Sequence, residues 1–92
     1  MQVVGQHEIS DPETFFSGDP QEIADNAPSG VQARQFFPSQ DRSTAVCLWE
    51  GESIDAVRDY VDSVTGDASR NTYFEVNTEY AMGLPEAASA GA

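Results

Sequence analysis

The amphipathic stripe that follows Ser53 is the feature that most constrains the fold of this chain. Its apolar residues recur at spacings of three and four, which places them on one face of a helix: Ile54, Val57, Val61 and Val64. Ser53 stands before the stripe as a potential N-cap, and Gly66 stands where a left-handed residue closes a helix. A helix with one apolar face must pack against another layer of structure.

Four stretches are typical of the strands that such a layer needs, namely residues 3–9, 31–37, 44–50 and 71–77. The polar turn 38–42 joins the middle two and predicts an antiparallel hairpin. Two Asp-Pro pairs, at positions 11–12 and 19–20, each combine a capping carboxylate with a proline suited to the first helical position. They predict two short helical pieces, near Pro12–Phe16 and Pro20–Asn26, instead of one long helix.

The predicted order is therefore strand, helix, strand, strand, helix, strand. This order is that of the ferredoxin-like βαββαβ fold, an α+β fold with a four-stranded antiparallel sheet. A chain of 92 residues holds one domain with a modest core. We expect this domain to span residues 1–83 and to be followed by a flexible, Ala- and Gly-rich tail at 84–92.

Both faces of the predicted sheet are apolar, which favours a homodimer. In the third strand, Cys47 and Trp49 point to one face, whereas Val46 and Leu48 point to the other. Helices cover one face in this topology, so we expect a second copy to cover the open face, in a dimeric α/β-barrel arrangement. The alternative is that residues 80–92 or the broken first helix fold across it.

Net charge indicates the environment and excludes some partners. The chain has 16 Asp and Glu, four Arg and no Lys, for a formal net charge of −12. Such a surface repels itself unless salt screens it, which favours a halophilic protein in a high-salt cytoplasm. The alternative is an acidic mesophilic protein encoded by GC-rich DNA.

The same charge argues against nucleic acid and against an anionic membrane surface as partners, because both require basic patches. No apolar run approaches the roughly 20 residues of a membrane span, and the first residues lack the pattern of a signal peptide. The single cysteine cannot form an internal disulfide, which fits a reducing compartment. We therefore expect a cytoplasmic protein.

Four segments carry a family resemblance: residues 45–50 (AVCLWE), 53–58 (SIDAVR), 66–76 (GDASRNTYFEV) and 82–85 (MGLP). They resemble an uncharacterised group of small bacterial and archaeal proteins of ferredoxin-like, dimeric α/β-barrel character. A more distant similarity is to small nickel-binding proteins of the same architecture. That similarity implies a metal ion, and His7 is the position that can be matched to a ligand.

His7 and Cys47 are the residues best suited to chemistry. His7 lies near Glu8, Asp11 and Glu13, a set that can hold nickel or zinc if enough ligands meet, although good sites usually have three or four. The alternative is a histidine packed on the sheet and inert. Cys47 lies among apolar neighbours, which favours a buried structural thiol. The alternative is a reactive thiol with His7 as its base, which requires that the first and third strands are neighbours and that both side chains face the same way.

A pocket between sheet and helices is the other candidate site, with candidate residues His7, Arg34, Phe36, Cys47, Trp49, Tyr73 and Glu75. The alternative is that the aromatic residues form only core and interface. Glu75 points opposite to its neighbours and is either exposed or a pocket acid. Three further acidic residues lie close together in the sequence, at Glu50, Glu52 and Asp55. They either bind a cation or form a solvated acidic cluster.

No catalytic set is complete in the sequence, so the favoured function is a non-catalytic binding module for a small ligand or a metal ion. Two alternatives stay open. One is a cofactor-independent monooxygenase of the dimeric α/β-barrel type, for which His7 with Glu75 or Arg34 is the candidate set. The other is a structural or regulatory subunit that acts through its surface.

Overall fold

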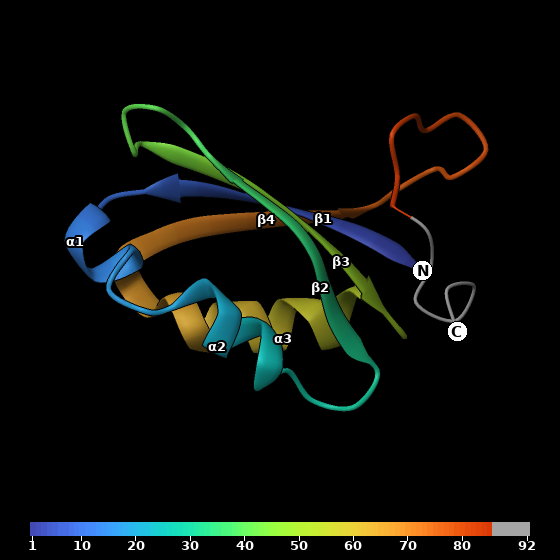
Figure 1. Cartoon of the computed structure of the whole chain (residues 1–92), viewed down its shortest axis with the longest axis horizontal. Coiled ribbons are helices and arrows are strands. Elements are labelled where there is room, and N and C mark those ends of the chain that lie inside the picture. The colour runs from blue at the N-terminus through green and yellow to red at the C-terminus, as the bar shows by residue number, and fades with distance from the viewer. Residues whose placement is uncertain (86–92) are drawn as a thin grey trace.

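A computed structural model describes residues 1–85 and has a four-stranded antiparallel sheet with its helices on one face (Figure 1). The elements in chain order are β1 (Gln2–Ile9), α1 (Pro12–Phe15), α2 (Pro20–Asp25), β2 (Val31–Pro38), β3 (Thr44–Gly51), α3 (Ile54–Thr65), the 3₁₀ turn η1 (Gly66–Ala68) and β4 (Ser69–Glu75). The strand order β2-β3-β1-β4 is that of a small ferredoxin-like fold. The predicted α+β fold is therefore confirmed.

The register of the central strand determines which side chains meet beneath the helices. β1 pairs with β3 and β4, and Gly5 lies between Cys47 and Tyr73. Two residues further along, His7 lies between Ala45 and Asn71. Directly paired residues of an antiparallel sheet point to the same face, so all six positions belong to the face that carries the helices.

The first helical segment is broken in two, as the Asp-Pro pairs predict. Asp11 accepts a hydrogen bond from the Thr14 amide at 3.3 Å, and Asp19 accepts one from the Gln21 amide at 2.9 Å. A proline follows each cap at the first position of the helix. Both helices end one residue earlier than predicted, and neither buries a residue completely.

Helix α3 supplies the apolar surface that covers the sheet. Ser53 caps it by accepting a hydrogen bond from the Ala56 amide at 3.0 Å, and Gly66 closes it with a φ of 56°. Val64 remains 40% exposed at the end of the stripe. The core cluster joins α3 to β1, β2 and β3 through Val3, Val31, Cys47, Trp49, Val57 and Val61.

The main correction to the predicted elements concerns β4. It was expected at 71–77 but runs from Ser69 to Glu75, because Ser69 already pairs with Ile9 immediately after the short η1 turn. Past its end, Val76 still donates a hydrogen bond to the Gln2 carbonyl at 2.8 Å. The other three strands are each one residue longer than predicted.

No helix of residues 1–85 covers the second face of the sheet (Figure 1). Phe37, Val46 and Phe74 lie on this open face and are 60%, 41% and 47% exposed. Within the same residues, no helix is long and apolar enough to cross a membrane. Most of the predicted flexible tail, residues 86–92, lies outside the described part of the chain.

Candidate functional site

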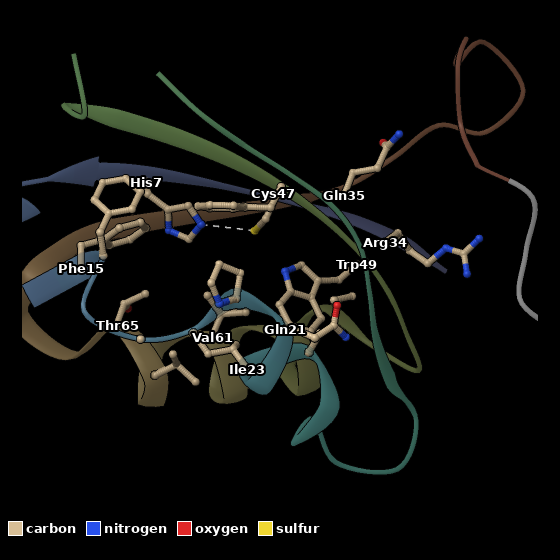
Figure 2. A pocket seen from close by; sticks show the side chains of 17 residues that line it. His7, Phe15, Gln21, Ile23, Arg34, Gln35, Cys47, Trp49, Val61 and Thr65 are labelled. Carbon is tan, nitrogen blue, oxygen red and sulfur yellow. Dashed lines mark hydrogen bonds between the residues drawn. The ribbon is translucent and has the colours of Figure 1, made fainter. Parts of the chain in front are cut away.

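A cavity of about 350 Å³ lies between the sheet and the helices (Figure 2). Its floor comes from β1, β2 and β3, and its walls come from α3 and from the broken segment that contains α1 and α2. Two short helices, α1 and α2, cover this part of the sheet in place of one continuous helix. Pro20, which begins α2, is itself part of the cavity wall.

Aromatic side chains line one end of the cavity. The Phe15 ring lies 5.4 Å from the His7 ring in an edge-to-face arrangement and 6.4 Å from the Phe36 ring in a stacked one. Phe16 packs edge-on against Phe15 at 4.9 Å. Arg42 lies over the Phe16 ring at 5.0 Å and covers it from outside. These contacts hold the α1 segment against the sheet.

His7 is buried in this site, at 4% exposure, and both of its ring nitrogens are engaged. Nδ1 lies 2.7 Å from Asn71 Oδ1, and Nε2 lies 3.2 Å from Cys47 Sγ. Burial lowers the pKa of His7, because it disfavours the charged form more than Asn71 and the nearby Asp62 charge favour it. The imidazole is therefore neutral at pH 7.

Asn71 is held in one orientation by neighbouring groups. Its amide nitrogen donates to Asp62 Oδ1 at 2.9 Å and to Thr65 Oγ1 at 2.8 Å. Ser69 donates its hydroxyl to Asn71 Oδ1 at 2.7 Å. The amide oxygen therefore faces His7 and accepts from Nδ1–H, which leaves the lone pair of Nε2 directed at the Cys47 thiol.

Cys47 is also 4% exposed, and the sequence allows it to approach His7 because Gly5 has no side chain. A Cβ atom at position 5 would lie 2.8 Å from Cys47 Sγ. Burial raises the pKa of the Cys47 thiol, so the resting pair is a neutral thiol beside a neutral imidazole.

Trp49 carries an unpaired polar group at the cavity wall. Its ring packs edge-on against Tyr60 at 5.8 Å, and the residue is 5% exposed. The indole N–H lies close enough to Cys47 to oppose the rise in the pKa of the thiol, but it makes no hydrogen bond of good geometry among residues 1–85. Figure 2 shows the indole nitrogen turned toward the cavity.

The predicted pocket residues divide into two groups. His7, Cys47, Trp49 and Phe36 line the cavity together. Arg34 lies at its edge on β2, but Figure 2 shows its side chain pointing away from the cavity.

The two β4 candidates do not belong to the lining. The Tyr73 hydroxyl donates to Asp62 Oδ1 at 2.7 Å beside α3, and burial together with Asp62 raises the pKa of Tyr73. Glu75 pairs with Val3 at the far end of the strand and is exposed, so it and His7 are four positions apart along the ladder.

The sequence interpretation missed Asn71 and the lining residues of α1 and α2. The parity of β4 was the available signal for Asn71, since it shares a face with Tyr73 and lies opposite His7. The hydrogen-bond partners of Asn71 depend on how α3 packs on the sheet, and no local sequence pattern predicts that packing.

Residues 1–85 contain no group of three or more His, Cys, Asp or Glu side chains placed to hold a metal ion. Glu8, the sequence neighbour of His7, is exposed and points to the other face of the sheet. A nickel or zinc site at His7 stays a prediction.

Of the three acidic residues Glu50, Glu52 and Asp55, Asp55 forms an ion pair with Arg58 at 2.6 Å.

Comparisons of the chain with protein-family models, with curated proteins and with solved structures find no match.

Proposed function

We propose that this protein binds a small neutral molecule, with an aromatic or apolar body and one carbonyl oxygen, in the cavity between sheet and helices. The unpartnered N–H of buried Trp49 is the observation that carries the proposal. A buried donor without a partner costs about 1–3 kcal/mol, which a ligand acceptor restores on binding. The volume of about 350 Å³ lies in the range of small-molecule sites.

The lining supports a neutral ligand. Among residues 1–85, the cavity wall includes no Asp or Glu, and the one cationic residue at its edge, Arg34, points outward. His7 is neutral, so the cavity contains no charge to pair with an ion. The net charge of −12 disfavours anionic ligands further.

A matched pair of probes tests the proposal. Acetophenone and ethylbenzene have similar shapes, but only the ketone carries an acceptor. We expect acetophenone to raise the melting temperature, and to bind about fivefold more tightly than ethylbenzene, as one net hydrogen bond of about 1 kcal/mol implies. Binding is followed by the fluorescence of the single tryptophan, Trp49, and by thermal unfolding.

Two variants serve as controls for this experiment. Trp49→Phe keeps an aromatic ring and removes the N–H, so the preference for acetophenone should disappear; thermal unfolding is the readout, because this variant has no tryptophan. Ala24→Leu places extra volume in the cavity wall and should weaken both probes. If neither acetophenone nor ethylbenzene binds, the proposal is overturned. A thermal shift with nickel or zinc that disappears in His7→Gln would favour a metal-binding module in its place.

The open sheet face supports a second proposal, that two copies associate through it. Phe37, Val46 and Phe74 expose apolar surface there, and half-buried Val4 of the central strand pairs with Phe74 on the same face. Exposed apolar patches of this kind are rare on monomers, and a twofold dimer covers the same patch on both subunits.

Sedimentation velocity in high KCl tests the dimer. We expect the wild type to sediment as a dimer and the double variant Phe37→Asp/Phe74→Asp to sediment as a monomer with unchanged circular dichroism. Met82→Gln is the matched control, because Met82 is 95% exposed and lies outside the strands. A wild-type protein that remains monomeric at all concentrations contradicts the proposal.

We place this binding module in a high-salt cytoplasm. Support comes from the charge of −12 and from the scarcity of compensating cations, since Arg58 makes both ion pairs found within residues 1–85. The free thiol of Cys47 fits a reducing compartment.

A further inference from the structure

The grouping of Cys47, His7 and Asn71 goes beyond ligand binding. Cys47 Sγ lies 3.2 Å from His7 Nε2, and His7 Nδ1 lies 2.7 Å from Asn71 Oδ1. A nucleophile, a base within hydrogen-bond reach and a third group that orients the base are the elements of activated-cysteine catalysis. They come from β3, β1 and β4, three strands adjacent in the sheet, so the scaffold that holds them is rigid.

The hydrogen bonds determine the direction in which a proton can move. Asn71 presents its oxygen to His7, because its nitrogen is occupied by Asp62 and Thr65. His7 therefore carries its proton on Nδ1 and offers Nε2 to the Cys47 thiol. This tautomer is the one that a general base needs.

The charge state of the pair sets the timing of proton transfer. Burial raises the pKa of Cys47 and lowers that of His7, so the proton resides on sulfur at rest. The thiol is consequently unreactive until an electrophile occupies the cavity. Transfer to His7 then accompanies attack by sulfur.

Trp49 supplies the group that a carbonyl electrophile requires. It lies two residues from Cys47 on β3, so both side chains point to the same face of the sheet. Its unpartnered N–H can donate to a carbonyl oxygen beside the sulfur and stabilise the negative charge that develops during attack.

We propose that Cys47 is a nucleophile that accepts an acyl group from a neutral ester or thioester bound in the cavity. His7 is the general base, Trp49 is the oxyanion donor and Asn71 is a positioning residue. This inference rests on the proposed binding function, because the substrate occupies the same cavity as the neutral carbonyl ligand.

The step balances without an additional reagent. Sulfur forms a bond to the carbonyl carbon, the bond from that carbon to the leaving oxygen or sulfur breaks, and the thiol proton passes through His7 to the departing alcohol or thiol. Water, activated by the same imidazole, then hydrolyses the acyl-cysteine to a carboxylic acid and restores the thiol.

The first test uses 4-nitrophenyl acetate as the acyl donor. Release of 4-nitrophenol gives the rate, and mass spectrometry of digested protein locates the acetyl group. We expect acetylation at Cys47, no fast release from Cys47→Ala, and a rate for His7→Gln that is lower by about 10²-fold or more. Equal rates for wild type and His7→Gln overturn the assignment of the base.

A pH profile of the wild type keeps the test decisive if His7→Gln does not fold. Attack assisted by neutral His7 gives a rate that is nearly flat between about pH 7 and 8.5. Direct attack by a free thiolate instead rises about tenfold per pH unit below the pKa of the thiol. A tenfold slope over this interval contradicts general-base assistance.

The role of Asn71 has its own pair of variants. The double variant Asn71→Asp/Asp62→Asn keeps an oxygen acceptor for His7 Nδ1–H and exchanges the amide and carboxylate of the Asn71–Asp62 hydrogen bond, whereas Asn71→Leu removes the acceptor. We expect acetylation within about tenfold of wild type for the double variant, with its pH profile shifted because a carboxylate next to His7 raises the pKa of the imidazole. Asn71→Leu should lose most of the rate. Equal rates for these two variants overturn the positioning role.

Acetophenone separates the failure of this inference from the failure of the binding proposal, because the ketone binds without transferring an acyl group. If acetophenone binds but Cys47 is acetylated no faster than a thiol in the urea-unfolded chain, the acyl-transfer inference is wrong and binding stands. If acetophenone fails to bind as well, both proposals fall.

Discussion

At the residue scale, the burial of His7 beside a thiol links stability to pH. An unfolded histidine has a pKa of about 6.5, whereas burial holds the pKa of His7 lower. As pH falls below about 6.5, the unfolded chain binds a proton that the folded chain does not. The contribution of His7 to the free energy of unfolding is therefore complete above about pH 6.5 and is lost as pH falls towards the pKa of the folded state.

We expect the difference in stability between wild type and His7→Gln to shrink as pH is lowered from about 8 to 5. Urea unfolding at several pH values measures it. Cys47 and Asp62 face His7 from β3 and α3, and the many surface carboxylates titrate in both proteins, so the difference isolates the imidazole. A constant difference would mean that the pKa of His7 is the same in the folded and the unfolded protein.

Position 5 of β1 has no room for a side chain. An added Cβ would meet Cys47 Sγ at 2.8 Å and Tyr73 Cε1 at 3.0 Å. We expect Gly5→Ala to destabilise the protein by about 1–3 kcal/mol in thermal or urea unfolding. Gln6→Ala, at the neighbouring exposed position, should change stability by no more than about 0.5 kcal/mol. Similar effects for both variants would contradict the close packing at Gly5.

Residue types alone identify His7, Cys47 and Trp49 as chemically capable, and strand parity predicts that Cys47 and Trp49 share a face. The pairing of His7 with Cys47 follows from topology, since β1 and β3 are neighbours in this fold. The third member, Asn71, could not be assigned, because its orientation depends on Asp62 and Thr65 of α3. Contacts between elements of this kind leave no periodic signal in the sequence.

At the element scale, local capping signals account for most of the helix boundaries. Ser53 accepts from the Ala56 amide at 3.0 Å at the start of α3. We expect Ser53→Ala to lower the free energy of unfolding by about 1 kcal/mol. Ser63→Ala in the same helix is the matched control and should be neutral or slightly stabilising, because alanine is the better helix former. Equal losses would show that the cap contributes nothing specific.

The broken segment with α1 and α2 shows where sequence reasoning stops. Both proline-initiated helices could be predicted, with ends accurate to one residue. The cavity over β1 and β3 could not, because it depends on how Phe15 and Ile23 pack against the sheet. The ends of β4 were misplaced for a related reason, since pairing with β1 sets them and local propensity does not.

At the scale of the whole molecule, the charge of −12 opposes compaction. Repulsion between surface carboxylates is screened when the Debye length falls from about 10 Å at 0.1 M salt to about 3 Å at 1 M. We expect the melting temperature to rise by several degrees between these KCl concentrations. Scanning calorimetry or thermal circular dichroism measures the change.

The double variant Glu50→Gln/Glu52→Gln provides the control for this prediction, because it removes two neighbouring charges at the end of β3. It should be more stable than wild type at 0.1 M KCl and should respond less to added salt. Full stability of the wild type at low salt, with no response to KCl, would contradict the proposed adaptation to high salt.

The most direct test of the central claim is the NMR signal of the Trp49 indole N–H. The chain has one tryptophan, so a ¹⁵N-labelled sample gives a single indole cross-peak. On titration with acetophenone we expect this peak to move downfield as the carbonyl accepts the N–H, and to shift less or in another direction with ethylbenzene. An indole peak that stays in place while acetophenone binds elsewhere, or that responds identically to both probes, would contradict a ligand site built around the buried N–H of Trp49.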